Sequence, residues 1–114
     1  MSEKRLAQVN TLIQRELGTL LSREVELPKD VLVTVSRVRT SPDLANATVW
    51  LKVFPIERAE PTLATIVRHV YHLQKVLDRR LVMKFTPKIL FLLDQSEEGA
   101  DRIFRLLDNL KHDE

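Results

Sequence analysis

The sequence predicts one α+β domain over residues 1–114, with its elements in the order α-β-β-α-β-α. Three observations indicate this class. Apolar residues recur every three or four positions in two long stretches, they alternate with other residues in two shorter runs, and they form one unbroken run after Pro87. A chain of 114 residues can enclose a single core between two packed layers. We therefore expect a three-stranded mixed sheet with the helices on one face.

The first predicted element is a helix from Glu3 to Ser22. Its apolar residues are spaced so that they lie on one side of a helix: Leu6, Val9, Ile13, Leu17, Leu20 and Leu21. Pro28 ends this unit, because proline has no backbone N–H to continue a helical hydrogen-bond ladder.

Two strands are predicted next, over residues 31–36 and 45–53. Apolar side chains alternate in both: Val31, Val33 and Val35 in the first, and Ala45, Ala47, Val49, Leu51 and Val53 in the second. Only a short turn around Ser41-Pro42-Asp43 separates them, so the two strands must be antiparallel neighbours.

A long helix follows Pro61, and its apolar stripe runs without interruption to Leu81: Leu63, Ile66, Val67, Val70, Leu73, Val76, Leu77 and Leu81. After Pro87, residues 89–93 form a continuous apolar strand. A strand, a helix and a strand in succession imply a right-handed crossover, so the second and third strands should run parallel. Ser96 is a candidate N-cap for a last helix that turns Ala100, Ile103, Leu107 and Leu110 inward.

The composition excludes several classes of protein. With 44% hydrophobic residues and a mean hydropathy of −0.15, the chain is too apolar for a disordered protein, and no apolar run is long enough to cross a membrane. The absence of cysteine excludes disulfides, zinc fingers and thiol nucleophiles. The two glycines, Gly18 and Gly99, cannot form a phosphate-binding loop. No signal peptide is visible at the start, so we expect a cytoplasmic protein.

Charge is distributed unevenly along the chain. Residues 62–88 contain six lysines and arginines against one carboxylate, Asp78, whereas residues 89–114 contain three basic and seven acidic residues. A basic block of this kind indicates a polyanionic partner that approaches from one side.

The basic block has helical spacing. Arg68, His72, Lys75 and Arg79 fall within about 60° of arc on one continuous helix, away from the apolar stripe. Arg80, Lys84 and Lys88 could extend this ridge. We predict that these seven residues contact the phosphate backbone of a nucleic acid. An ordinary solvated helix face is the competing interpretation.

Catalytic and metal sites receive little support from the sequence. His69 and His72 form an H-x-x-H pair, but no further ligand lies one helical turn away, so we expect neither a metal nor a cofactor. Ser41 and Asp43 flank a proline as turn residues do, and no base is placed to activate the hydroxyl group. We therefore do not expect an enzyme.

Trp50 and Phe54 fall on the strand face opposite Val49 and Leu51, together with Lys52. This face could stack the bases of single-stranded RNA. It could also be covered by a loop or by Leu32, Leu90 and Leu92 of neighbouring strands, or it could bind another protein or a second copy of the chain. A domain of the RNA-recognition-motif type is disfavoured, since only three strands can be counted.

Three blocks of residues resemble the ribosome-binding factor A family of bacterial ribosome-assembly proteins. They are Ser41-x-Asp43-Leu44-x-x-Ala47-x-Val49, then Pro87-x-Ile89-x-Phe91-x-x-Asp94-x-Ser96, then Arg102-Ile103 with Leu107. The opening Arg5-x-x-x-Val9-x-x-x-Ile13-x-x-Glu16-Leu17 and the later Arg23-Glu24-Val25 are also similar to that family's first helix.

The resemblance implies a KH-like domain of the second topological type. It also implies a non-catalytic partner of the small (30S) ribosomal subunit and its 16S rRNA, acting in late maturation and rRNA processing and supporting growth in the cold. We expect it to act as a monomer. The family has an Ala-x-Gly kink between two helices where this chain has His69, Val70 and Tyr71. Without a glycine there, we expect one continuous helix, with its basic ridge as the RNA contact.

Overall fold

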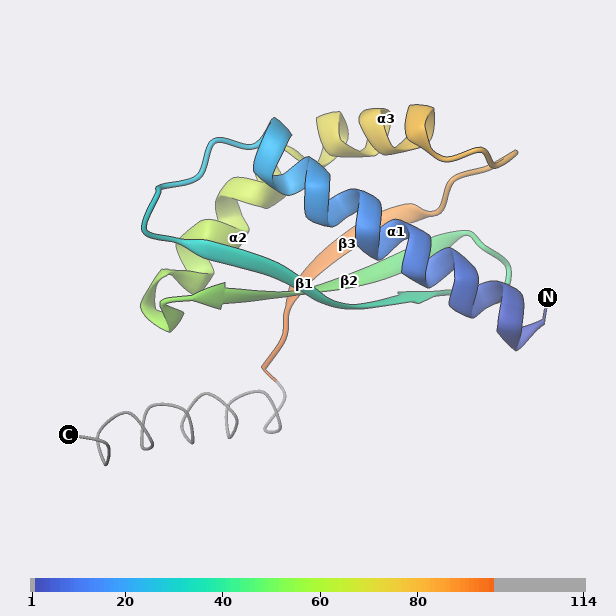
Figure 1. The fold of residues 1–114 in the computed structure, drawn as a ribbon, viewed down its shortest axis with the longest axis horizontal. Helices are drawn as coiled ribbons and strands as arrows, with labels where there is room; N and C mark the ends of the chain where they lie inside the picture. The colour runs from blue at the N-terminus through green and yellow to red at the C-terminus, as the bar shows by residue number, and fades with distance from the viewer. Residues whose placement is uncertain (1, 96–114) are drawn as a thin grey trace.

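The computed structural model describes residues 2–95 and contains helices and strands in the order α1-β1-β2-η1-α2-α3-β3 (Figure 1). Their bounds are Glu3–Glu24 for α1, Leu32–Thr40 for β1, Asn46–Phe54 for β2, Ile56–Arg58 for the 3₁₀ turn η1, Ala59–Arg68 for α2, Val70–Arg80 for α3 and Lys88–Leu93 for β3. The helix predicted after Ser96 lies outside the described residues.

The sheet has three strands in the order β1-β2-β3. β1 and β2 are antiparallel, β2 and β3 are parallel, and α2 and α3 form the crossover between the parallel pair. The mixed sheet predicted from the strand patterns is therefore confirmed. Gln74 of α3 binds the start of β3, because its side-chain amide donates to Pro87 O at 3.0 Å and accepts from Ile89 N at 2.9 Å.

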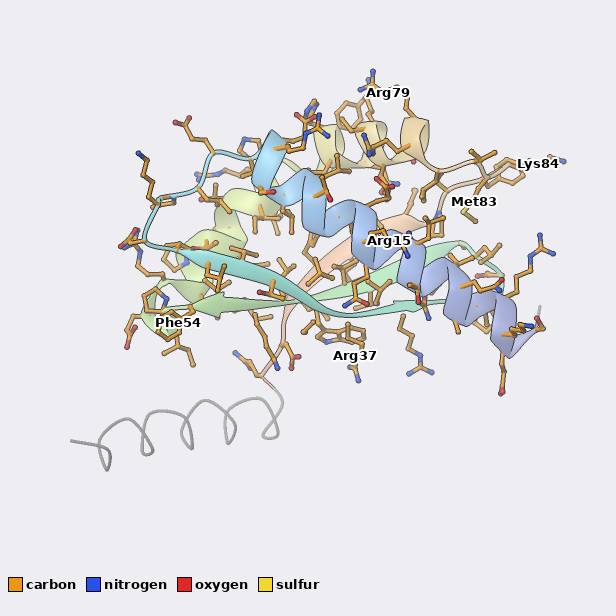
Figure 2. The ribbon with its side chains drawn as sticks, viewed as in Figure 1. Arg15, Arg37, Phe54, Arg79, Met83 and Lys84 are labelled. Carbon is orange, nitrogen blue, oxygen red and sulfur yellow. The ribbon has the colours of Figure 1, made fainter. Side chains whose placement is uncertain are left out.

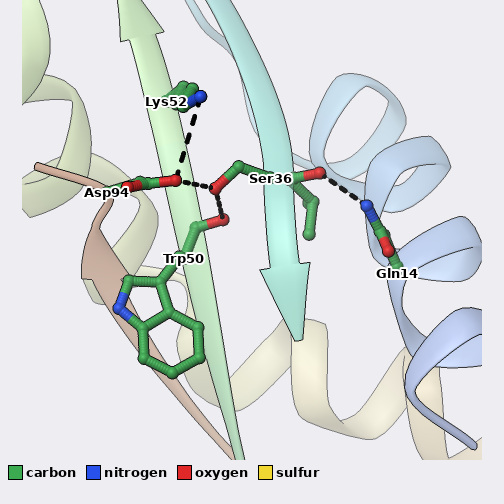
Figure 3. A network of polar contacts seen from close by, with 6 residues as sticks. Gln14, Ser36, Trp50, Lys52 and Asp94 are labelled. Atoms are coloured by element: carbon green, nitrogen blue, oxygen red, sulfur yellow. Dashed lines mark hydrogen bonds and ion pairs between the residues drawn. The ribbon is translucent and has the colours of Figure 1, made fainter. Parts of the chain in front are cut away.

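A β-bulge changes the phase of β1 between Val35 and Arg37. Val35 lies opposite Leu51, whereas Val38 lies opposite Val49, so both valines face the core although they are an odd number of residues apart. Gln14 of α1 donates its Nε2 hydrogen to Val35 O at 3.0 Å, next to the bulge (Figure 3). A helix side chain thus satisfies a strand carbonyl at the irregular position.

The core lies between the helices and one face of the sheet, as predicted. Figure 1 shows α1 lying across the sheet, with α3 beside it and α2 near the end of β2. The most deeply buried side chains come from both layers: Ile13, Leu17, Leu20, Leu51, Ile66, Leu73, Leu77 and Val49. Each buried leucine or isoleucine contributes about 1.5–3 kcal/mol by removal of its side chain from water.

The opposite side of the sheet is called the outer sheet face below. The described helices leave it open, because the outward strand positions are exposed or half-buried while most inward positions are buried. Its larger side chains are Leu32, Arg37, Arg39, Trp50, Lys52, Phe54, Lys88, Leu90 and Leu92.

The expectation of one continuous helix through residue 69 is wrong, because the helix breaks at His69 into α2 and α3. The His69 backbone has φ −99° and ψ 7°, a conformation that any residue can adopt. Its N–H donates to Ile66 O at 2.9 Å rather than to the carbonyl of Thr65. His69 Nδ1 lies 2.8 Å from that Thr65 carbonyl and can donate to it. The imidazole thereby replaces the lost ladder bond, and no glycine is required.

Candidate nucleic-acid interface

Two of the predicted basic residues lie at the junction of α3 with α1. His72 Nε2 is 3.4 Å from Glu24 Oε2, and Arg80 Nε is 2.5 Å from Glu16 Oε2. Glu24 at the end of α1 pairs with His72 near the start of α3, and Glu16, earlier in α1, pairs with Arg80 at the end of α3. The two helices therefore run antiparallel. The side chains of His72 and Arg80 thus connect α3 to α1, although both keep some exposure.

Lys75 and Arg79 lie one turn apart on the exposed side of α3. Lys75 Nζ lies 4.6 Å from the centre of the Tyr71 ring. Neither Lys75 nor Arg79 forms an ion pair with a carboxylate of residues 2–95. Figure 2 shows Arg79 projecting from α3 away from the sheet. These two cations are the part of the predicted ridge on α3 that has no carboxylate partner among the described residues.

Arg68 is the last residue of α2 and is exposed. Its Nη2 donates to Thr65 Oγ1 at 3.2 Å. Because His69 interrupts the helix, the arc calculated for a single straight helix does not apply to Arg68. The structure therefore separates Arg68 from the row formed by His72, Lys75 and Arg79.

Lys84 lies in the loop between α3 and β3, with its Nζ 5.7 Å from the centre of the Phe85 ring. It lines a groove of about 600 Å³ bounded by this loop, the first turns of α1 and the β1–β2 turn at Asp43. Arg5, Val9, Leu12, Met83 and Phe85 also line the groove. Lys84 thus shares a groove with Arg5, a basic residue that was not predicted.

Lys88 is the first residue of β3 and belongs to the outer sheet face, since the alternate residues Ile89 and Phe91 pack toward the core. It is therefore not part of the helical row. The seven predicted residues are all exposed, but they are divided among the end of α2, the outer side of α3, the α1–α3 junction, the following loop and the outer sheet face.

The outer sheet face contains two basic residues that were not predicted, Arg37 and Arg39. Simple alternation from Val33 and Val35 would turn both arginines inward, but the bulge turns them outward. The Arg37 guanidinium carbon lies 3.9 Å from the centre of the Trp50 ring. The sequence does contain a signal for this arrangement, because the apolar phase changes between Val35 and Val38.

A polar network joins all three strands on this face (Figure 3). Ser36 Oγ is 2.6 Å from Asp94 Oδ2 and 3.2 Å from Trp50 O, so its proton goes to the nearer carboxylate. Lys52 Nζ is 4.0 Å from the same Asp94 oxygen, and Asp94 N donates to Leu51 O at 2.8 Å. These bonds hold the end of β3 against β2 and β1.

Ser41 and Asp43 organise the turn between β1 and β2. Ser41 Oγ donates to Asp43 Oδ1 at 2.6 Å, and Ala45 N donates to the same oxygen at 3.0 Å. The Ser41 hydroxyl group, followed by the Ala45 amide, lowers the pKa of the Asp43 carboxyl below its usual range. Leu44 has a φ of 61°, and this hydrogen-bonded turn supports that left-handed residue. Ser41 is thus engaged as a turn residue.

The two predicted metal-ligand candidates have separate structural bonds. His69 binds the Thr65 carbonyl and His72 binds Glu24. Within residues 2–95, no group of three or more histidines and carboxylates is placed to hold a metal ion. None of the helices in this part of the chain is long and apolar enough to cross a bilayer.

Comparison with known proteins identifies the relatives of this chain. A family model described as ribosome-binding factor A matches residues 5–107. A ribosome-binding factor A from Opitutus terrae is 33% identical over 107 residues, which cover 93% of this chain and 87% of the relative. Another from Nitrosococcus oceani is 35% identical over 105 residues, which cover 91% of this chain and 83% of the relative.

Solved structures of the same kind are similar in fold. The crystal structure of ribosome-binding factor A from Thermus thermophilus aligns with a TM-score of 0.68 at 30% identity and covers 77% of this chain and 93% of that chain. A homology model of the T. thermophilus factor, fitted into a cryo-electron-microscopy map of a 30S complex, aligns with a TM-score of 0.61 at 30% identity, covering 73% and 88%. The predicted KH-like α+β class is confirmed.

Proposed function

Because the chain belongs to the ribosome-binding factor A family, we propose that it binds the small (30S) ribosomal subunit and contacts the 16S rRNA through its basic helical side. Lys75 and Arg79 are the centre of this contact. Arg68, His72, Arg80 and Lys84 contact the rRNA around this centre, and Lys88 contacts it from the outer sheet face. Binding occurs during late subunit maturation and rRNA processing.

The observation that carries this proposal is the likeness, over nearly the whole chain, to proteins named for ribosome binding, one of which has been fitted into a 30S complex. The charges agree with it. Lys75 and Arg79 are exposed and have no ion-pair partner among the described residues, so an rRNA phosphate could meet them without first breaking such a pair.

The protein acts by binding, as a cytoplasmic monomer in which residues 1–114 form one KH-like domain. The family match over residues 5–107 and the continuous core of the described residues support a single domain. A role without catalysis is supported by the bonds of Ser41, His69 and His72, each of which binds another group of the fold.

Sedimentation with ribosomal particles tests the proposal. The protein should travel with free small subunits and not with full ribosomes. If it neutralises four or five phosphates, the logarithm of the binding constant should fall with the logarithm of salt concentration with a slope of roughly −3 to −4. Replacing Arg68, Lys75 and Arg79 together by glutamate should weaken binding by about tenfold or more and reduce the slope by about 3.

A matched control variant distinguishes an effect of the α2–α3 surface from an effect of the overall net charge. Replacing Arg15, Arg23 and Lys29 by glutamate changes the net charge by the same amount on exposed positions of α1 and the following loop. This control should retain clearly more affinity than the α2–α3 variant. Equal loss in both variants would show that overall charge, rather than the helical side, determines binding.

The competing function is association with protein through the outer sheet face. It predicts binding that is insensitive to salt and is lost in Trp50→Ala, with no effect of the α2–α3 variant.

A further inference from the structure

The outer sheet face presents aromatic and cationic side chains next to each other. Trp50, Lys52 and Phe54 occupy successive outward positions of β2, because side chains on one face of a strand are two residues apart. Phe54 is 54% exposed and Trp50 is half-buried. The described helices pack on the other side of the sheet, so no helix of residues 2–95 covers the outer sheet face.

The charge of this face indicates an anionic partner. None of the three strands contains an acidic residue, whereas Arg37, Arg39, Lys52 and Lys88 all point outward. Asp94, which directly follows β3, contacts Lys52 and Ser36. Two copies of the chain placed face to face would bring these cations together, which disfavours self-association through this surface.

The geometry suits unpaired nucleotides. Nucleic-acid bases stack on aromatic rings and on guanidinium planes, and the Arg37 guanidinium already lies 3.9 Å from the centre of the Trp50 ring. Along β2, Trp50 and Phe54 are about 13 Å apart, with Lys52 halfway between them. A strand of nucleotides that places one base at each aromatic side chain would carry its backbone past the lysine.

We propose that the outer sheet face binds single-stranded RNA, with bases stacked on the Arg37–Trp50 pair and on Phe54 and a phosphate group at Lys52. This rests on the proposed function, because it adds a second RNA contact to the same ribosome-binding chain. The ligand is an unpaired segment, since the bases of a duplex are stacked on each other and cannot reach a flat protein face.

Trp50 is the only tryptophan in the sequence and reports directly on this contact. The experiment titrates the full chain with a ten-nucleotide single-stranded RNA of mixed sequence, and in parallel with the same RNA annealed to its complement. Stacking should quench the tryptophan fluorescence saturably with the single strand and far less with the duplex. Raising the salt concentration should weaken the quenching, because a phosphate contact releases counterions.

A pair of phenylalanine variants provides the matched control. Phe54→Leu removes the second stacking ring at an exposed position and should weaken the single-strand affinity roughly tenfold while the fold is retained. Phe85→Leu makes the same change at a ring that is 73% exposed in the loop before β3, away from this face, and should leave the affinity unchanged. Circular dichroism verifies that both variants are folded.

Four results would overturn the proposal. The first is the absence of quenching by single-stranded RNA, and the second is equal weakening in the two phenylalanine variants. The third is equal quenching by polyglutamate, which would assign the face to an acidic protein. The fourth is a dimer in sedimentation equilibrium that is lost in Trp50→Ala, which would assign it to a second copy.

The same measurements distinguish this proposal from the proposed function. If the protein sediments with small subunits but its tryptophan does not respond to the oligonucleotide, the second RNA contact is wrong and ribosome binding stands. If the oligonucleotide quenches the tryptophan but the protein does not sediment with subunits, ribosome binding is wrong and the single-strand site stands.

Discussion

The two basic sides of this protein use their cations differently. On the helical side, α1 packs antiparallel to α3, and its carboxylates Glu16 and Glu24 pair with Arg80 and His72. On the sheet side the strands contain no acidic residue, and Arg37 lies over the Trp50 ring instead. A basic side chain therefore stabilises the fold where the neighbouring element supplies a carboxylate. Where the neighbouring element supplies none, the side chain remains available to a partner.

This difference also separates residues on one helix. Arg79 and Arg80 are adjacent in the sequence, yet Arg80 faces Glu16 and Arg79 points away from the fold. Adjacent helical residues are 100° apart around the axis, which is enough to move a side chain from a helix junction into solvent. The four experiments below test the comparison, beginning with the largest expected effect.

Leu51→Ala should damage both sides at once. Leu51 is fully buried on the central strand, between the helical layer and the outer sheet face. Removal of its side chain should lower the free energy of unfolding by about 2–5 kcal/mol, because a cavity adds to the lost burial. Urea unfolding measures this change. Leu90→Ala, at a side chain that is 57% exposed on the neighbouring strand, should cost much less.

His69→Ala should affect the helical side alone. It removes the imidazole that binds Thr65 O at the break between α2 and α3, at a cost of about 0.5–1.5 kcal/mol in the free energy of unfolding. The loss of this bond should also loosen the position of Arg68 relative to α3. We expect weaker sedimentation with small subunits and an unchanged tryptophan response to single-stranded RNA. An equal loss of subunit binding and of the tryptophan response would show that the helical side and the outer sheet face are not independent.

Glu16→Gln should release Arg80 from its ion pair and make it available to a phosphate group. The variant removes the charge that pairs with Arg80, at a cost of no more than about 1 kcal/mol, because the arginine is 41% exposed. Freed Arg80 should strengthen binding to small subunits and make the salt slope more negative by up to about 1. Glu57→Gln, at an exposed carboxylate in η1, is the control. A slope unchanged from the wild type would place Arg80 outside the contact.

Asp43→Asn should have the smallest effect, because it changes only the hydrogen bonds of one exposed turn. The pKa of the Asp43 carboxyl is lower in the folded state than in the unfolded state, because its hydrogen bonds favour the ionised form. The ionised Asp43 therefore stabilises the folded state at pH values above its unfolded pKa of about 3.9. This contribution is lost as the pH falls through the lower folded value, so it is present at pH 7 and declines at acid pH. Urea midpoints should therefore differ between variant and wild type at pH 7, and the difference should shrink toward pH 3. A difference that is constant with pH would contradict this.

Much of the fold could be predicted from periodicity. The apolar spacing of α1, the alternation in β1 and β2 and the unbroken run of β3 each follow from which side chains must leave water. The same reasoning missed the break at His69, because the apolar stripe of α2 continues in phase into α3. At the break the His69 imidazole binds the Thr65 carbonyl, and hydrophobic patterns carry no information about such a bond.

The sequence by itself determined the fold class, the inward face of β2 and the basic composition of the region around α3, since these depend on local spacing and on charge along the chain. Only the tertiary structure decided which cations are paired and which are open. The partners Glu16 and Arg80 are 64 residues apart, and the bulge beside Val35 determines where Arg37 points. Pairing across such separations depends on how the layers pack in space, and neither periodicity nor composition encodes that directly.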